Sequence, residues 1–225
     1  SIVAALLHDT IEDTSVTHER LAKEFGSTVA DLVEGVTKLT RVQLVSKEDA
    51  QMESLRKMLM AMSKDIRVIL IKMADRLHNM RTMQYQSEEK QRSKSLETME
   101  IYAPIAHRLG IQKVKWELED LSLKYLDPVA YEDINRSLEA ESAQHDQFMS
   151  RIQSEINDRL TDLGIVHATV YGRVKHPYSI YRKMYAQEKT MEEVYDLFAF
   201  RVLVDTVADC YNVLGVVHDM FTPLP

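Results

Sequence analysis

Two pairs of adjacent polar residues in the segment ALLHDTIEDT, residues 5–14, are of the types that act on charged substrates. His8 and Asp9 form the first pair, and Glu12 and Asp13 form the second pair one helical turn later. Residues four positions apart share a helix face, so each member of the first pair should lie beside its counterpart in the second. The neighbouring residues are apolar, which predicts a largely buried helix. Buried carboxylates are costly unless something neutralises them, and a metal ion is the simplest remedy.

A metal site needs further ligands, because one helix cannot surround an ion. Asp75, in the segment KMADRLHNMRT at residues 72–82, is the best further ligand, and Asn79 lies one turn beyond it. With His8 and Asp9 it offers nitrogen and hard oxygen ligands, which suit Mn²⁺ or a similar divalent ion. The second acidic pair would then be free to orient and deprotonate an attacking water. The sequence leaves a simpler interpretation open, in which His8 and Asp9 only cap or pair within a helical bundle.

A second group of residues, in GRVKHPYS at residues 172–179, has the pattern of a phosphate site. The segment runs from a predicted strand into a helix with a proline at its start, and free N–H groups at a helix N-terminus attract phosphate. Ser179 and Lys183 are four apart on one helix face, with Lys175 just upstream. Asp196 opens the next predicted strand and can hold Mg²⁺ against such phosphates. The alternative is a solvated basic helix start and an unrelated carboxylate at a strand edge.

Composition limits the possible functions. The chain has 225 residues, of which 45% are hydrophobic and 28% charged, as in a globular protein. Its net charge of −7 argues against nucleic-acid binding across a broad surface. Cys210 is the only cysteine, so a disulfide framework and a thiolate zinc site are excluded, and a reducing cytoplasm fits. No apolar run reaches the roughly 18 residues of a membrane span, and no signal peptide is recognised.

The pattern of apolar residues predicts two domains of different class. Residues 1–127 read as helices throughout, with cap residues between them. Residues 128–225 begin with a polar helical stretch and then contain β-type runs at Ile165–Tyr171 and Leu197–Val204, separated by a helix starting at Pro177. We therefore expect a helical bundle followed by an α/β domain. The chain starts without Met and stops where a loop begins, so we expect an internal fragment in which both domains are truncated.

Several segments together resemble the RelA/SpoT family, the enzymes that make and degrade the alarmone (p)ppGpp in the stringent response. The matching segments, in the family's order, are HDTIEDT (8–14), GVTKL (35–39), ADRLHNMRT (74–82), YAPIAHRLG (102–110), WELEDL (116–121), YGRVKHPYSIYRKM (171–184) and YDL (195–197). They cover nearly the whole chain. The resemblance implies an all-α HD-type hydrolase bundle followed by a mixed-sheet, nucleotidyltransferase-like synthetase domain.

For the first domain, the resemblance implies a manganese-dependent hydrolase that removes the 3′-pyrophosphate of ppGpp or pppGpp. The residues that match the family's site are three metal ligands (His8, Asp9 and Asp75), two that activate water (Glu12 and Asp13) and two that contact the nucleotide (Asn79 and Thr82). The family's remaining histidine ligand and its guanine-stacking basic residues would lie before Ser1.

For the second domain, the resemblance implies transfer of pyrophosphate from ATP to the 3′-hydroxyl of GDP or GTP. The matching residues are Arg173 for the adenine, Lys175, Ser179 and Lys183 for the phosphates, and Asp196 for Mg²⁺. The family's guanine-stacking tyrosine and second acidic ligand would follow Pro225. The truncated chain is therefore expected to hydrolyse little and to synthesise no alarmone.

The partners implied are guanine nucleotides and ATP in the cytoplasm, without a membrane. Direct nucleic-acid binding is not expected of this chain, because the family's ribosome and tRNA contacts belong to other regions. Two alternatives stay open: an HD-type nucleotide phosphohydrolase whose second domain only senses nucleotide, and a binding module without catalysis.

Overall fold

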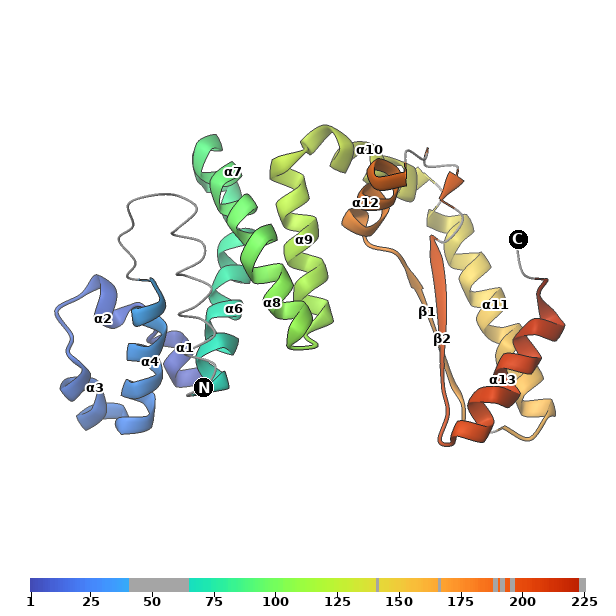
Figure 1. Ribbon diagram of the computed structural model, residues 1–225, viewed down its shortest axis with the longest axis horizontal. Helices are drawn as coiled ribbons and strands as arrows, with labels where there is room; N and C mark the ends of the chain where they lie inside the picture. Colours follow the sequence, from blue (N-terminus) through green and yellow to red (C-terminus); the bar gives the residue numbers. More distant parts are fainter. Residues whose placement is uncertain are drawn as a thin grey trace. The chain divides into compact units, whose positions relative to one another are not determined.

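The computed structural model describes residues 1–40, 65–140, 142–165, 167–187, 190, 193–194 and 197–222. The chain divides into two compact units, Ser1–Pro128 and Val129–Pro225, and each has its own hydrophobic core. Within the described residues the first unit is entirely helical, whereas the second combines helices with a two-stranded sheet (Figure 1). This agrees with the predicted order of a helical part and an α/β part. No helix among the described residues is long and apolar enough to cross a membrane.

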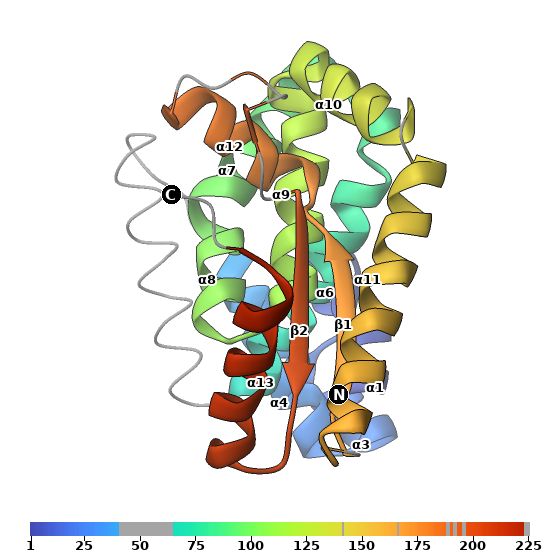
Figure 2. The ribbon, with the colours of Figure 1, turned by 90° about the vertical axis from the view of Figure 1, so that its right-hand side faces the viewer.

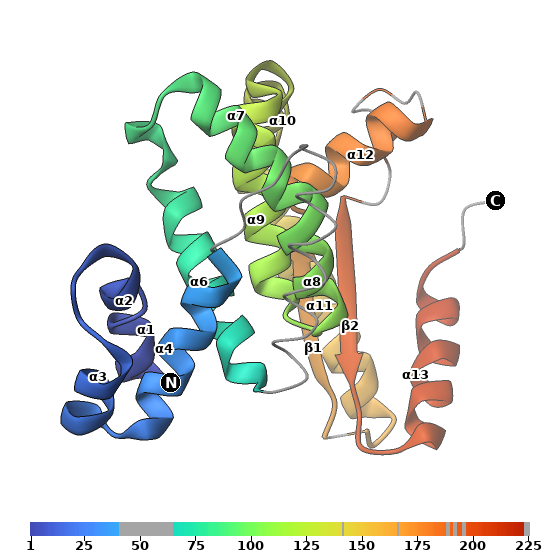
Figure 3. The same ribbon diagram turned by 60° about the vertical axis from the view of Figure 1, so that its left-hand side comes forward.

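The first unit is a series of mostly short helices (Figure 3). They are α1 (Ile2–Leu6), α2 (Thr10–Asp13), α3 (His18–Phe25), α4 (Ser27–Thr40), α6 (Ile66–Arg81), the 3₁₀ helix η1 (Met83–Tyr85), α7 (Glu88–Glu97), the π-helix η2 (Thr98–Tyr102), α8 (Ala103–Arg108) and α9 (Gln112–Leu126). Local signals in the sequence set several of these ends. Thr17 caps α3 and Asp65 caps α6 by accepting hydrogen bonds from backbone N–H groups, and Gly26 ends α3 with a φ of 88°.

The core of the first unit is formed mainly by α4, α6, η2 and α8, with Leu118 of α9. Met73, Met80 and Leu118 are fully buried there. Gly35 allows α4 to approach α6 closely, because a Cβ at this position would lie 2.9 Å from a methyl group of Val68. This packing holds α6, the helix that carries Asp75, in the middle of the unit.

The prediction of one buried helix over residues 5–14 is wrong. The segment forms α1 and α2 with a turn between them, in which the Thr10 hydroxyl donates to the carbonyl of Leu7 at 2.6 Å. The segment is also not largely buried, because Leu6 is 81% exposed and the carboxylates of Glu12 and Asp13 are exposed. A pattern of apolar residues alone cannot locate such a turn, because the turn depends on side-chain hydrogen bonds to the backbone.

The second unit consists of α10 (Pro128–Ala140, starting at the last residue of the first unit), α11 (Ser142–Asp162), β1 (Thr169–Val174), α12 (Pro177–Gln187), β2 (Phe198–Leu203) and α13 (Val207–Met220). The two strands are antiparallel, with Gly172 opposite Phe200. β1 starts later than predicted, because Ile165 instead closes the end of α11 through a hydrogen bond to the carbonyl of Leu160.

One face of the two-stranded sheet is covered by helices α11 and α13 (Figure 2). Val170 and Phe200 pack on this face with apolar residues of both helices. Gly172 also lies on it, since a Cβ there would meet Met149 of α11. Successive side chains of a strand alternate between faces, so the residues between these positions lie on the opposite face.

Candidate functional site

Three predicted metal ligands converge in the first unit. The Nε2 atom of His8 lies 3.0 Å from Oδ2 of Asp9 and 3.4 Å from Oδ1 of Asp75. His8 and Asp9 lie in the turn between α1 and α2, and Asp75 projects from the middle of α6. The packing of α1 against α6 brings these positions together.

The hydrogen bonds of His8 leave one ring nitrogen directed at the carboxylates. Its Nδ1 donates to the carbonyl oxygen of Ala5 at 2.9 Å, since a carbonyl can only accept. Its Nε2 is buried, and neither nearby carboxylate has hydrogen-bond geometry to it. A neutral imidazole held in this way presents a lone pair at Nε2, as in many metal-binding histidines.

Asp75 is held in place by two neighbours on its own helix. Lys72 Nζ donates to its Oδ2 at 2.8 Å, and Asn79 Nδ2 donates to its Oδ1 at 2.7 Å. Burial raises the pKa of Asp75, but the hydrogen bond and charge of Lys72, with the charge of Arg76, outweigh burial and hold that pKa below its ordinary value. Asp75 is therefore a fixed carboxylate, and sequence reasoning missed Lys72 although its i, i+3 spacing was visible.

Two separations in this cluster are compatible with a divalent ion, but the three side chains do not by themselves form a metal site. Neighbouring ligands of an octahedral ion bound at about 2.1 Å lie about 3.0 Å apart, close to the separations between His8 and the two carboxylates. Each carboxylate oxygen has two lone pairs, so Asp75 can keep its hydrogen bonds and still bind an ion. Within the described ranges, however, no group of three or more His, Cys, Asp or Glu side chains is arranged so that it could hold a metal ion. An ion at His8 would thus need further ligands.

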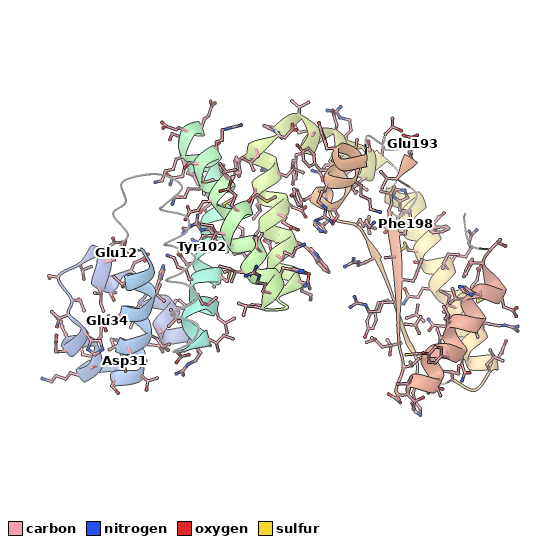
Figure 4. The ribbon with its side chains drawn as sticks, viewed as in Figure 1. Glu12, Asp31, Glu34, Tyr102, Glu193 and Phe198 are labelled. Carbon is pink, nitrogen blue, oxygen red and sulfur yellow. The ribbon has the colours of Figure 1, made fainter. Side chains whose placement is uncertain are left out.

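The other predicted residues of the first unit lie around this cluster with different surroundings. Glu12 and Asp13 are exposed on α2 and make no ion pair with His8 in the described part of the chain (Figure 4). Thr82 ends α6, and its hydroxyl donates to the carbonyl oxygens of His78 at 3.1 Å and Asn79 at 3.3 Å. The structure therefore brings three of the seven residues into one cluster, to which Asn79 is attached through Asp75.

A buried arginine next to Asp75 anchors this part of α6. Arg76 is 6% exposed, donates to Glu97 Oε1 at 2.9 Å and lies over the ring of Tyr102 at 4.0 Å (Figure 4). Lys94 also donates to Glu97, at 2.9 Å. These contacts connect α6 to α7 and to the π-helix that follows it. The contacts of Arg76 therefore fix α6 at the residue next to Asp75.

The second unit places most of its predicted site residues around the start of α12. Lys175 follows β1, and its backbone N–H donates to the carbonyl of Leu197 at 2.8 Å. Ser179 and Lys183 lie on α12, and their side chains are partly buried. Ser179 Oγ lies 2.6 Å from Nε2 of His176. Asp196 lies outside the described residues.

The sheet face opposite α11 and α13 carries two arginines and a tyrosine. Arg173 and Tyr171 are exposed on β1, and Arg201 is exposed opposite Tyr171 on β2. Arg201 is thus a diagonal neighbour of Arg173, at a distance of about 7–8 Å between such positions. Sequence reasoning missed Arg201, because the strand register that places it beside Arg173 was not known.

Two family models and several curated relatives match the chain. Residues 1–112 match the HD domain, and residues 172–225 match the region found in RelA and SpoT proteins. The chain is 47% identical to a probable guanosine-3′,5′-bis(diphosphate) 3′-pyrophosphohydrolase of Synechocystis and 50% identical to a GTP pyrophosphokinase of Streptomyces coelicolor. It is 47% identical to the bifunctional (p)ppGpp synthase/hydrolase SpoT of Escherichia coli K12.

All three matches extend over the whole chain, but the chain covers only 30%, 26% and 32% of these relatives. It therefore spans about a quarter to a third of the length of the curated relatives it matches. The HD domain precedes the RelA and SpoT region in this chain, and the identity to these relatives extends across both regions. The chain belongs to the RelA/SpoT family.

Proposed function

We propose that the first unit hydrolyses the 3′-pyrophosphate of ppGpp or pppGpp and releases pyrophosphate and GDP or GTP. The observation that carries this proposal is the convergence of His8, Asp9 and Asp75 within an HD domain. Membership of this family suggests the use of a divalent metal ion and action on guanine nucleotides and ATP. The nitrogen and carboxylate donors favour Mn²⁺.

In the proposed reaction, water attacks the phosphorus attached to the 3′-oxygen, and the bond between this phosphorus and the 3′-oxygen breaks. His8, Asp9 and Asp75 would hold the ion, which when bound supplies Lewis-acid chemistry at the pyrophosphate. The exposed carboxylates of Glu12 and Asp13 accept the proton of the attacking water, and a proton returns to the 3′-oxygen of the nucleotide.

Two more residues of the first unit are proposed to position the substrate. Asn79 uses its amide nitrogen to hold Asp75, which leaves its amide oxygen to accept a hydrogen bond from the nucleotide. Thr82, exposed at the end of α6, would contact the same molecule.

The second unit is proposed to bind ATP for pyrophosphate transfer in the complete protein. The 3′-hydroxyl of GDP or GTP loses its proton and attacks the β-phosphorus of ATP, the bond between the α- and β-phosphates breaks, and AMP leaves. Lys175, Ser179 and Lys183 would contact the phosphates at the start of α12, where free N–H groups favour anions. Asp196 would hold Mg²⁺.

We assign the adenine of ATP to the sheet face opposite α11 and α13. Arg173 and Arg201 are diagonal neighbours there, and a guanidinium group stacks well on a planar ring. The neighbouring Tyr171, which is 53% exposed, widens this surface. We expect both reactions to occur in the cytoplasm.

The hydrolase proposal is tested by measuring products from ppGpp, with and without Mn²⁺, in the complete protein and its Asp75→Ala variant. We expect equal amounts of GDP and pyrophosphate, dependent on Mn²⁺ and abolished in the variant. Release of single phosphates would instead support a general HD-type phosphohydrolase. Nucleotide binding without any turnover would support a module that only binds.

A further inference from the structure

The hydroxyl of Ser179 and the imidazole of His176 are in hydrogen-bond contact at the start of α12. Ser179 Oγ lies 2.6 Å from His176 Nε2, and the Ser179 backbone N–H donates to the carbonyl of His176 at 3.0 Å. The backbone just before this turn is held by the hydrogen bond from Lys175 to Leu197. Both side chains are partly exposed, so a ligand can reach the hydroxyl from solvent.

The position of one proton decides what this hydroxyl offers to a phosphate. When Nε2 of His176 is unprotonated, Ser179 donates to it and presents only oxygen lone pairs outward. When Nε2 carries a proton, it donates to Ser179 Oγ, and the hydroxyl proton is free. The oxygens of a bound nucleotide phosphate accept hydrogen bonds, so only the second arrangement gives an attractive contact.

We propose that His176 is a positioning residue of the phosphate site: its Nε2–H donates to Ser179 Oγ and thereby directs the Ser179 hydroxyl proton to a phosphate oxygen of ATP. His176 acts through Ser179 and does not itself touch the nucleotide. The proposal concerns which ring nitrogen of His176 carries the proton, and a neutral imidazole can carry it at Nε2. The inference rests on the proposed function, because that function places the ATP phosphates at α12.

Binding of α,β-methylene-ATP to the complete protein, measured by calorimetry, tests this relay. The analogue has no cleavable bond between its α- and β-phosphates, so binding is separated from transfer. The variants are His176→Phe, Ser179→Ala and the double variant, with His218→Phe, at an exposed position of α13, as the matched control. His176→Gln retains an N–H donor near the position of Nε2.

The relay predicts a specific pattern of affinities. Ser179→Ala loses a hydrogen bond to a charged group and should weaken binding roughly ten-fold or more. His176→Phe loses the donor that holds the Ser179 hydroxyl in the binding direction and should weaken binding by a smaller factor. The double variant should be no weaker than Ser179→Ala alone, because the two residues act as one unit. His176→Gln should recover most of the affinity, and His218→Phe should bind like the wild type.

A spectroscopic measurement gives an answer even if His176→Phe fails to fold. The ¹⁵N chemical shifts of His176 in the wild-type protein report which ring nitrogen is protonated. We expect Nε2 to be protonated when the analogue saturates the site. An unprotonated Nε2 in the complex, or normal affinity of His176→Phe beside weak binding of Ser179→Ala, would refute the relay and leave the proposed function standing. Absence of analogue binding to the wild type would contradict the proposed ATP site itself, and the relay with it.

Discussion

The Nε2 atom of His8 lies 3.4 Å from the Oδ1 atom of Asp75, although one residue sits in the turn after α1 and the other in the middle of α6. This approach depends on how α1 packs against α6. The imidazole is oriented from one side by the carbonyl of Ala5, and the carboxylate is oriented from the other side by Lys72 and Asn79. Both groups are therefore preorganised before any ion or nucleotide binds.

Replacing Asp75 by Asn should weaken Mn²⁺ binding at least about ten-fold, because the substitution removes the negative charge of a proposed ligand and keeps its shape. Titration with Mn²⁺ followed by electron paramagnetic resonance measures the free ion directly. Asp31→Asn is the matched control, since Asp31 pairs with His18 on the surface at 2.8 Å and should not affect the ion. Equal affinity in the two variants would place the ion elsewhere.

Lys72→Met should lower the free energy of unfolding by about 2–4 kcal/mol in the presence of a chelator. The side chains of Lys72 and Asp75 are only 12% and 11% exposed, so the substitution leaves an uncompensated buried carboxylate. The double variant with Asp75→Asn should be less destabilised than Lys72→Met alone, because both charges are gone. Urea unfolding measures all of these energies, and purely additive effects would contradict the pairing.

Glu97→Gln should lower the free energy of unfolding by about 2 kcal/mol at neutral pH, because it leaves buried Arg76 without its carboxylate partner. Burial raises the pKa of Glu97, but the charge of Arg76 and the hydrogen bond and charge of Lys94 outweigh burial and hold that pKa below its usual value. A lowered native pKa gives stability that is complete above the pKa of the unfolded chain and is lost as pH falls through the native value.

The difference between wild type and Glu97→Gln should therefore shrink in acid. Unfolding curves measured from neutral pH down to below the native pKa of Glu97 check this sign. Glu24→Gln removes an exposed pair with Arg20 and should change the unfolding free energy by less than about 1 kcal/mol at every pH. A constant penalty for Glu97→Gln across the pH range would argue against a titrating ion pair.

Gly172→Ala should destabilise the second unit by up to about 1 kcal/mol, because the new Cβ would lie 3.1 Å from the ring of Phe200 and would displace the flexible end of Met149. Gly215→Ala is a control of opposite sign, since nothing lies within 4 Å of its Cβ position and alanine favours a helix by roughly 1 kcal/mol. Thermal unfolding of the two variants gives the comparison. Equal stabilisation by both substitutions would contradict the close packing at β1.

Much of the secondary structure could be predicted from the sequence, because it depends on neighbours along the chain. The caps at Thr17 and Asp65, the stop at Gly26 and the span of α13 are signals of this local kind. The same holds for the order of a helical part before an α/β part. The sequence also identified His8, Asp9 and Asp75 as a group, through their residue types and the resemblance of the surrounding segments.

Other features required the tertiary structure. The turn that separates α1 from α2 arises from side-chain hydrogen bonds to the backbone, which hydrophobic periodicity does not register. The strand register decides that Arg201 lies diagonally across from Arg173. The contacts of buried Arg76 with Glu97 and Tyr102 likewise depend on the tertiary packing. Contacts between distant segments depend on how whole faces of helices and sheets pack together. The residue types along one segment do not specify which other segment will pack against it.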